Sequence, residues 1–258
     1  MILEYKGIQV FFSDQGLGKT IVLLHGFLEN SSMWNHLIPD LQKTHRVIAV
    51  DLLGHGQTGC LGYVHSMELM AETVEAVLNH LNIEEKTLVG HSMGGYVALA
   101  IAEKNPDSIR GLCLMNSTYL PDNDERRILR TRANLMAQTN FENLVRMSFT
   151  NLFSLESKEI YKSEMKIALT EALKTSIQGY MAANEGMKIR TDKTELFKSL
   201  PTKKLLIIGK KDPILEANSV KKILKGTDVE IVEFSQGHMS HIENITELTY
   251  IIMHFIEK

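Results

Sequence analysis

The sequence predicts an α/β protein in which a mostly parallel sheet of eight strands carries helices on both faces. Short apolar runs recur along the chain, as expected for strands that are covered on both sides. Amphipathic stretches with helical spacing alternate with these runs, which is typical of a parallel sheet with crossover helices. The alternation stops over residues 118–200 and then resumes, so we also expect a helical insertion.

The first half of the chain contains six of the predicted strands. Two short extended pieces lie on either side of Lys6-Gly7 within residues 3–12, and a turn-rich segment follows. A helix is expected from about Ser31, whose hydroxyl can cap a first turn. The remaining strands are expected at 20–24, 47–50, 86–89 and 111–115, and the remaining helices at 67–81 and 96–103.

Strands and helices alternate again after the insertion. Strands are expected at 204–208 and 229–234, and helices at 216–224 and from about 245 onward. We therefore expect residues 1–117 and 201–258 to form one core, with residues 118–200 as a helical cap subdomain. A length of 258 residues suits one α/β domain with an insertion.

The composition excludes several classes of protein. With 44% hydrophobic and 23% charged residues, the chain has the composition of an ordinary globular protein. The net charge is -3 and the basic residues are dispersed, so neither nucleic acid nor an anionic membrane is an expected partner. No apolar stretch approaches the roughly 20 residues of a membrane-spanning helix. A small neutral or weakly charged molecule is the expected partner.

The cysteines and the amino terminus indicate the expected environment. Cys60 and Cys113 are the only cysteines, so no disulfide framework or metal cluster is implied. The first residues lack the basic stretch and apolar run of a secretory signal. We expect a cytoplasmic protein that needs neither a metal nor an organic cofactor, and the oligomeric state stays open.

One motif carries a specific chemistry. Gly90-His91-Ser92-Met93-Gly94-Gly95 directly follows a buried-strand run and directly precedes a helical pattern. That context is the one in which a nucleophilic serine occupies a sharp turn between a strand and a helix. Glycines at 90 and 94 let the backbone turn closely, and the helix start adds donors beside a developing negative charge. Ser92 is therefore the candidate nucleophile.

At this motif the chain resembles the α/β-hydrolase superfamily, and the resemblance extends over nearly its whole length. It implies the α/β-hydrolase fold with a helical cap and no cofactor. It also implies an oxyanion hole made by the backbone N–H groups of Met93, after the nucleophile, and Phe27, within His25-Gly26-Phe27. The turn from Asp51 to Gly56 is similar to a structural turn of the family.

The resemblance also implies the base and the acid. The order in this fold is serine, acid, histidine. His238 follows a glycine after the last strand, and Asp212 follows the preceding strand with the family's Gly-x-x-Asp spacing. Asp122 and Asp124 are the backup acids. His91 is expected to support the structure, and His241 to pack rather than to bind a metal with His238.

These residues favour a serine hydrolase that cleaves an ester or a related acyl bond. Hydrolysis of a carbon–carbon bond, thioester hydrolysis, acyl transfer, a lyase reaction and a ligand receptor that retains the triad stay open. Methionines and aromatic residues of the insertion, among them Met181 and Met187, favour an adaptable apolar pocket that prefers apolar over charged substrates. Gly16-Leu17-Gly18-Lys19-Thr20 resembles a phosphate-binding loop, but it lacks the first glycine and precedes its strand.

Overall fold

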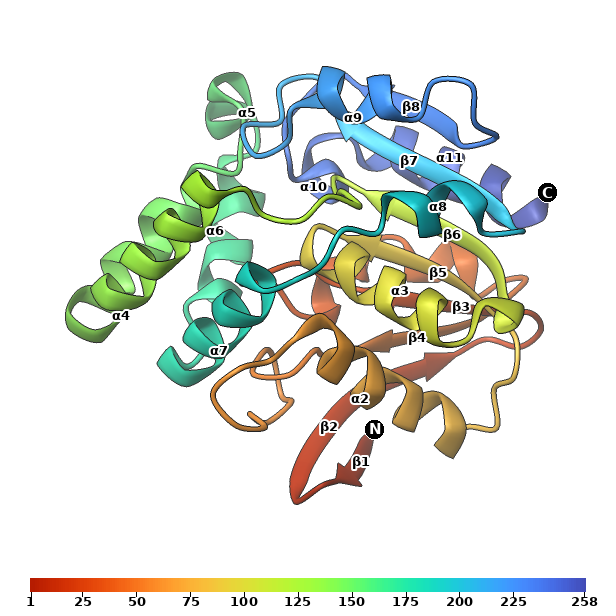
Figure 1. The fold of residues 1–258 in the computed structure, drawn as a ribbon, viewed down its shortest axis with the longest axis horizontal. Helices are drawn as coiled ribbons and strands as arrows, with labels where there is room; N and C mark the ends of the chain where they lie inside the picture. Colours follow the sequence, from red (N-terminus) through yellow and green to blue (C-terminus); the bar gives the residue numbers. More distant parts are fainter.

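The computed structural model describes all 258 residues and contains one sheet of eight strands (Figure 1). The strands are β1 (Ile2–Tyr5), β2 (Ile8–Gln15), β3 (Thr20–Leu24), β4 (Arg46–Val50), β5 (Lys86–His91), β6 (Ile109–Met115), β7 (Lys203–Gly209) and β8 (Glu230–Phe234). Their order across the sheet is β1-β2-β4-β3-β5-β6-β7-β8. The β1–β2 and β2–β4 pairs are antiparallel and all other pairs are parallel, which confirms the predicted sheet.

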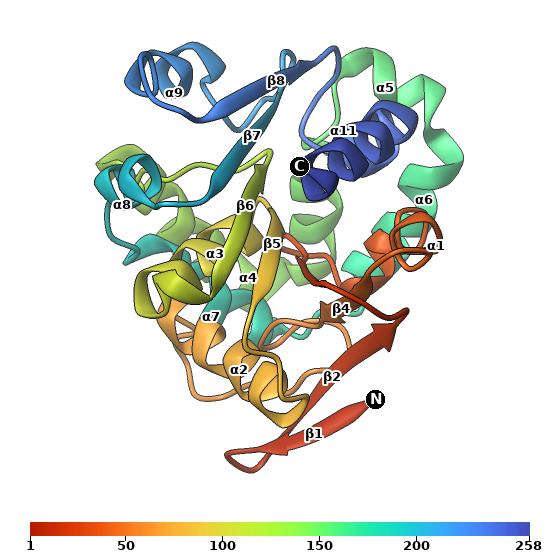
Figure 2. The same cartoon turned by 90° about the vertical axis from the view of Figure 1, so that its right-hand side faces the viewer.

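Helices cover both faces of this sheet (Figure 2). One face carries α2 (Met67–His80), α3 (Met93–Lys104), α8 (Thr194–Ser199) and α9 (Ala217–Ile223). The other face carries the 3-10 turn η1 (Ser31–Trp34), α1 (Ile38–Leu41) and α11 (Ile245–Glu257). Two short helical segments, η2 (Pro106–Ser108) and α10 (Ser240–Glu243), complete the core.

The central strands are apolar throughout because each of their faces lies in a different core. Along β3, Val22 and Leu24 pack in the cluster beneath α2 and α3, whereas Ile21 and Leu23 pack in the cluster beneath α1 and α11. Successive side chains of a strand point to opposite faces, so a strand between two helical layers has no exposed position. This geometry explains the continuous apolar runs.

The segment after β3 differs from the predicted single helix. Asn30, not Ser31, caps the first turn by accepting a hydrogen bond from the Ser32 backbone N–H at 3.0 Å. The turn is a short 3-10 segment, and α1 begins separately at Ile38. Pro39 has no N–H to donate to the preceding turn, so one continuous helix could not keep its hydrogen bonds here.

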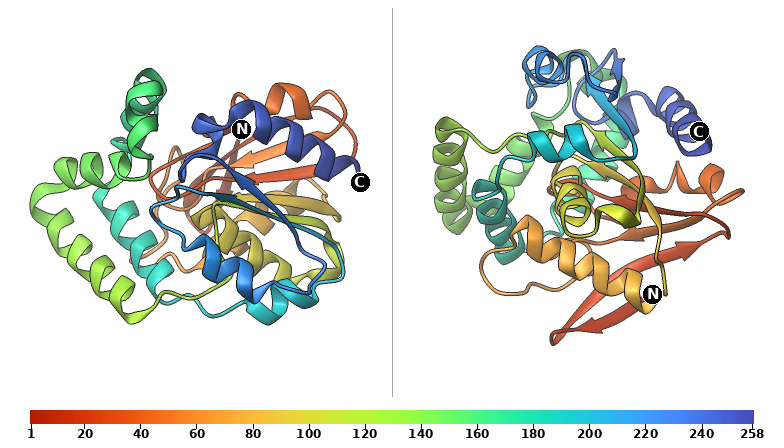
Figure 3. Two further views of the ribbon diagram at one scale, coloured as in Figure 1. Left: turned by 90° about the horizontal axis from the view of Figure 1, so that it is seen from above. Right: turned by 45° about the vertical axis from the view of Figure 1, so that its right-hand side comes forward.

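Helices alone form the segment between β6 and β7, as the pattern predicted. They are α4 (Asp124–Thr150), α5 (Leu155–Ile160), α6 (Lys162–Ala172), α7 (Ile177–Lys188) and α8. Figure 3 shows α4 to α7 beyond one end of the sheet, where the parallel strands reach their carboxyl ends. The last helix, α8, instead packs on the sheet layer, because Phe197 belongs to the core cluster beneath α2 and α3. The division into a core and a cap stays a prediction.

No helix of the structure is both long enough and apolar enough to cross a lipid bilayer.

Candidate active site

Ser92 lies at the junction of β5 and α3 in a strained backbone conformation. Its φ of 48° and ψ of -114° fall in a region that residues other than glycine rarely adopt. The flanking glycines make this turn possible. A Cβ atom on Gly94 would lie 2.2 Å from the carbonyl oxygen of Leu24, and one on Gly90 would lie 2.4 Å from that of Gly94. The sequence motif therefore reflects close backbone contacts that only glycine permits.

The structure brings Ser92, His238 and Asp212 together from the turns after β5, β8 and β7. His238 Nδ1 lies 2.8 Å from Asp212 Oδ2, and His238 Nε2 lies 2.9 Å from Ser92 Oγ. A carboxylate can only accept, so Nδ1 donates to Asp212 and Nε2 is left to accept from the serine hydroxyl. The arrangement can therefore take the proton from Ser92 Oγ.

Asp212 is held as a charged acceptor. Its Oδ1 accepts from the backbone N–H groups of Ile214 and Leu215 at 2.8 and 3.1 Å. Burial by itself would raise the pKa of Asp212, but His238, the Ile214 N–H and the Asn116 amide together hold it below its usual value. Asp212 therefore stays ionised beside the imidazole.

Asn116 is a supporting residue that the sequence reasoning did not single out. It directly follows β6 and has a φ of 44°. Its Nδ2 donates to Asp212 Oδ2 and to the Gly237 carbonyl, both at 3.1 Å, and its Oδ1 accepts from Ser240 Oγ at 2.5 Å. The amide thus ties the acid to the loop that carries His238. A polar residue directly after a buried strand was the only signal in the sequence.

The two predicted oxyanion donors lie on either side of Ser92. Met93 is the first residue of α3, so its N–H has no acceptor within the helix. The Phe27 N–H takes part in no hydrogen bond of the structure. The Phe27 ring lines the cavity at Ser92 and lies 4.9 Å, centre to centre, from the ring of Tyr180. The role of both amides stays a prediction.

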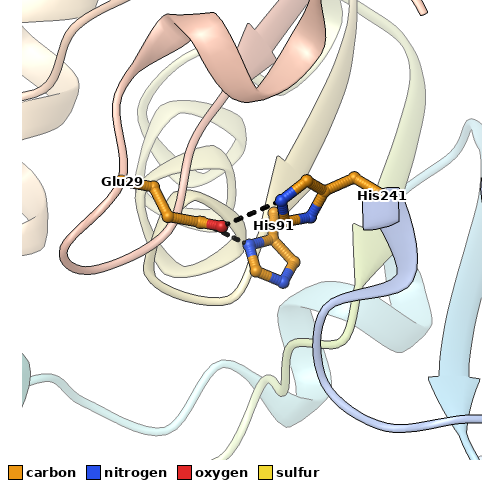
Figure 4. Close-up of side chains that lie close together, drawn as sticks. All are labelled: Glu29, His91 and His241. Atoms are coloured by element: carbon orange, nitrogen blue, oxygen red, sulfur yellow. Dashed lines mark hydrogen bonds and ion pairs between the residues drawn. The ribbon is translucent and has the colours of Figure 1, made fainter. Parts of the chain in front are cut away.

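Glu29, His91 and His241 form a buried cluster (Figure 4) that contacts the backbone of His238. Glu29 Oε2 lies 2.6 Å from His91 Nδ1 and also accepts from the Gly26 N–H at 2.8 Å. His91 Nε2 lies 3.0 Å from the His238 carbonyl oxygen. Both ring nitrogens of His91 therefore face acceptors, and only the doubly protonated ring can donate to both.

Electrostatics in this cluster agree with the hydrogen bonds. Burial alone would lower the pKa of His91, but the Glu29 carboxylate and the His238 carbonyl raise it above its usual value. Burial likewise opposes ionisation of Glu29, yet the neighbouring imidazoles lower its pKa to about 2. Burial dominates at His241, whose pKa falls to about 4. The shifts thus favour an ion pair between Glu29 and His91 beside a neutral His241.

The same three residues are the types that bind zinc. Two ligand atoms on a tetrahedral zinc lie about 3.3 Å apart when each bond is near 2.0 Å. Glu29 Oε2 and His91 Nδ1 are only 2.6 Å apart, which is a hydrogen-bond distance. We therefore describe the cluster as an ion pair, and the predicted independence from metals remains to be tested.

The other residues weighed from the sequence have structural partners. Asp122 is buried between Arg130 and Arg190, whereas Asp124 is exposed and pairs with Arg127. Neither backup acid is thus placed to serve His238. Asp51 accepts from the backbone N–H groups of Ser31 and Gln57 at 2.7 and 2.8 Å.

A cavity of about 110 Å³ contains Ser92 and His238. Met187 lines it, but Met181 lines a separate hollow on the outer side of α4 and α7. Apolar walls come from Phe27, Leu28, Leu152, Met187 and Ile214, and polar or charged ones include Arg126 and Arg130. The apolar wall agrees with the composition of the insertion, whereas the two arginines were not anticipated.

A larger cavity of about 390 Å³ lies on the other side of Leu28 and Glu29, against α6 and the start of α11. It contains neither Ser92 nor His238. We therefore assign the chemistry to the smaller cavity.

Comparisons with known proteins agree with this fold. The family model of the alpha/beta hydrolase fold matches residues 19–245. A solved thermophilic esterase from Thermogutta terrifontis, with malate bound, is 27% identical and superposes with a TM-score of 0.92 over 99% of this chain and 96% of its own. A pyrrolizixenacetamide deacetylase of Xenorhabdus hominickii is 28% identical over 96% of this chain and 94% of its own length.

Other curated relatives are longer proteins. The dihydrolipoyllysine-residue acetyltransferase component of the acetoin cleaving system of Pseudomonas putida is 29% identical over 93% of this chain, which spans 64% of that protein. Several further relatives are matched over a third of their length or less. The match of the family model over most of the sequence nevertheless shows that the chain belongs to the alpha/beta hydrolase fold family.

Proposed function

We propose that this chain is a serine hydrolase that cleaves a carboxylic ester, or a closely related acyl bond, of a small substrate. The observation that carries the proposal is the line of hydrogen bonds from Ser92 Oγ through His238 to Asp212, 2.9 and 2.8 Å long. A serine, a histidine and a buried carboxylate in this order activate the hydroxyl for attack on a carbonyl carbon.

The reaction then follows from the positions of the groups. Ser92 Oγ attacks the carbonyl carbon while His238 Nε2 takes its proton. The N–H groups of Phe27 and Met93 stabilise the negative oxygen of the tetrahedral intermediate. His238 returns the proton to the leaving alcohol, and an acyl-enzyme remains on Ser92. A water molecule, deprotonated by His238, attacks the acyl-enzyme, and His238 then returns this proton to Ser92 Oγ as the bond to the serine breaks and the acid leaves.

The relatives support the kind of bond that is broken. The solved relative is named an esterase and the relative matched along its length a deacetylase, and each of these activities removes an acyl group. The small volume at Ser92 favours short acyl or alcohol groups, and its apolar walls favour a hydrocarbon body on the substrate.

A panel of esters, thioesters and lactones, with Ser92→Ala as the control, tests the proposal. We expect turnover of short-chain esters that Ser92→Ala reduces by on the order of 10⁴-fold or more, without loss of the folded state. A fluorophosphonate should label Ser92 alone, and EDTA should leave the rate unchanged. Labelling without turnover of any panel member would contradict hydrolysis and favour a receptor that retains the triad.

The acid is tested by a matched pair of substitutions. Asp212→Asn should lower kcat by on the order of 10⁴-fold at nearly unchanged stability, because the amide favours the wrong imidazole tautomer. Asp122→Asn should retain kcat but lower the melting temperature, because Arg130 and Arg190 lose their shared carboxylate. The opposite pattern of rates would move the acid to Asp122.

A further inference from the structure

The cavity at Ser92 contains a cationic group without a carboxylate partner. Arg126 lines the cavity, and its Nη2 donates to the carbonyl oxygen of Ile214 at 2.8 Å. Ile214 lies two residues after Asp212 and donates its own N–H to that carboxylate. The guanidinium of Arg126 is thus held beside the acid loop of the triad. No ion pair of the structure includes Arg126, whereas the next residue, Arg127, pairs with Asp124.

The surroundings of Arg126 add further positive charge. Arg130, one helical turn along α4, also lines the cavity and pairs with Asp122. The same carboxylate pairs with Arg190 at 2.6 Å. The guanidinium of Arg190 lies 4.1 Å from the ring centre of Tyr96, another residue of the cavity wall. Arg130 and Arg190 thus share one carboxylate and Arg126 pairs with none, so these three guanidinium groups carry two more charges than the carboxylate beside them.

The carboxylates on the core side do not balance this excess. Asp212 is committed to His238, and Glu29 is committed to His91 and the Gly26 N–H. An anionic group in the cavity would therefore gain from the arginines without displacing an existing ion pair. A guanidinium binds a carboxylate with two parallel N–H donors, and Arg126 uses only one of its donors in the structure.

We propose that Arg126 is a specificity-determining residue that binds a carboxylate of the substrate, so that the preferred substrates are small esters with a free carboxylate, such as monoesters of short dicarboxylic acids. This inference rests on the proposed hydrolysis at Ser92. The apolar walls then contact the hydrocarbon between the carboxylate and the scissile ester. It reverses part of the preference expected from the composition, because neutral esters, like cationic ones, should be poorer substrates than esters that carry a carboxylate.

Monoethyl succinate and ethyl 4-methylpentanoate form a matched pair of substrates, because an isopropyl group replaces the carboxylate at similar volume. We expect the wild-type protein to favour the succinate by roughly tenfold to 100-fold in kcat/KM, the value of a hydrogen bond to a charged group. Arg126→Gln should abolish this preference, because KM should rise for the succinate much more than for the neutral ester. Proton release in a pH-stat measures both reactions.

Arg127→Gln is the matched control on the same helix. Arg127 is exposed and lines no part of the cavity, so its replacement should keep the preference. If both variants lost the preference for the succinate equally, the preference would come from the overall charge of the protein, and the proposal would be overturned. A wild-type preference for the neutral ester would also overturn it.

A binding measurement separates this inference from the proposed function. Calorimetric titration of Ser92→Ala with succinate requires no turnover. We expect binding that is lost in Ser92→Ala/Arg126→Gln and kept in Ser92→Ala/Arg127→Gln. If no ester is hydrolysed, the proposed function fails, while this titration still decides the anion site. Equal binding by the two double variants would overturn the role of Arg126.

Discussion

Two parts of the candidate site meet at one carboxylate oxygen, and His91 links a third part to it. Glu29 Oε2 accepts from Gly26, in the loop of the predicted oxyanion donor, and from His91, next to the nucleophile. His91 in turn donates to the backbone carbonyl of His238. The Glu29–His91 ion pair therefore connects the loop of Gly26 and Phe27, the end of β5 before Ser92, and the loop that carries His238.

Glu29→Gln should disturb this connection while it keeps the size of the side chain. An amide oxygen at the Oε2 position still accepts from Gly26 and His91, but the ring then loses its charge, and its Nε2 no longer donates to His238. If the amide nitrogen occupies that position instead, it faces the Gly26 N–H, and two donors cannot form a hydrogen bond with each other. We expect kcat to fall by roughly tenfold to 100-fold, as when groups that orient a functional histidine are removed, with KM nearly unchanged.

Steady-state kinetics and the rate of fluorophosphonate labelling of Glu29→Gln measure this effect. Glu164→Gln is the control, because Glu164 lines the larger cavity and not the one at Ser92. Nitrogen-15 spectra of the wild-type protein should show one histidine that keeps both ring nitrogens protonated to a higher pH than an exposed histidine does. A wild-type labelling rate in Glu29→Gln, together with a neutral His91, would show that the pair does not position the base.

At the scale of elements, α7 presents two different surfaces. Met187 belongs to the wall of the Ser92 cavity, whereas Met181, six residues earlier, lines the outer hollow. The helix packs along α4 through a buried polar contact, in which Asn184 Nδ2 donates to Asn134 Oδ1 at 2.9 Å. This contact fixes the rotation of α7 and hence which methionine faces the cavity at Ser92.

Met187→Ala should enlarge the cavity and shift the preference toward longer acyl chains. The additional space accommodates further methylene groups, each worth about 1–3 kcal/mol of discrimination in a hydrophobic pocket. We expect kcat/KM for hexanoyl esters to rise at least tenfold relative to acetyl esters. Met181→Ala, on the same helix, should leave the profile unchanged. An equal shift in both variants would mean that the preference for acyl chain length depends on the stability of α7 and not on the size of the cavity.

At the scale of the whole molecule, several buried histidines are neutral in the folded state. Burial lowers the pKa of His55 to about 3, and those of His65 and His241 to about 4. The unfolded chain protonates these residues near pH 6.5. Below that pH the unfolded state therefore binds more protons than the folded state, and stability falls as the pH decreases.

The stability of the protein should therefore fall between pH 6.5 and about pH 4. At pH 5 each of the three histidines contributes a loss of up to about 2 kcal/mol. His91 acts in the opposite direction: its raised pKa stabilises the folded state at low pH, and this contribution is lost as the pH rises through that pKa. Urea unfolding from pH 4.5 to 7.5 measures the slope.

His65→Gln tests the origin of this slope. The variant should flatten it, whereas the exposed His254, replaced by glutamine, should not change it. An unchanged slope in His65→Gln would show that this residue takes up its proton equally in both states.

The whole molecule also shows what could be predicted from the sequence. Because β3 to β7 are covered on both faces, their apolar runs could be recognised without knowledge of their neighbours. Ser92 could be recognised because its sharp turn requires glycine at neighbouring positions, and that requirement is local. His238 and Asp212 followed from the order of the family and from their place after strands.

The partners of the site were decided by the tertiary structure alone. Asn116, Glu29 and Arg126 come from three separate segments, and their roles depend on contacts across 96, 62 and 88 residues of sequence. Nothing in the sequence around these three residues distinguishes them from an ordinary turn, loop or helix residue. Met181 and Met187 likewise look alike in sequence, and only the packing of α7 on α4 separates them.

The sequence by itself therefore determined the layers of the fold and the sharp turn at Ser92, because burial and tight turns impose patterns on consecutive residues. The tertiary structure decided which charges are paired and which remain free, because an ion pair depends on distance in space. Arg126 and Arg127 are adjacent identical residues, yet Arg126 faces the cavity at Ser92 whereas Arg127 pairs with Asp124. That difference arises only when α4 packs over the carboxyl ends of the strands.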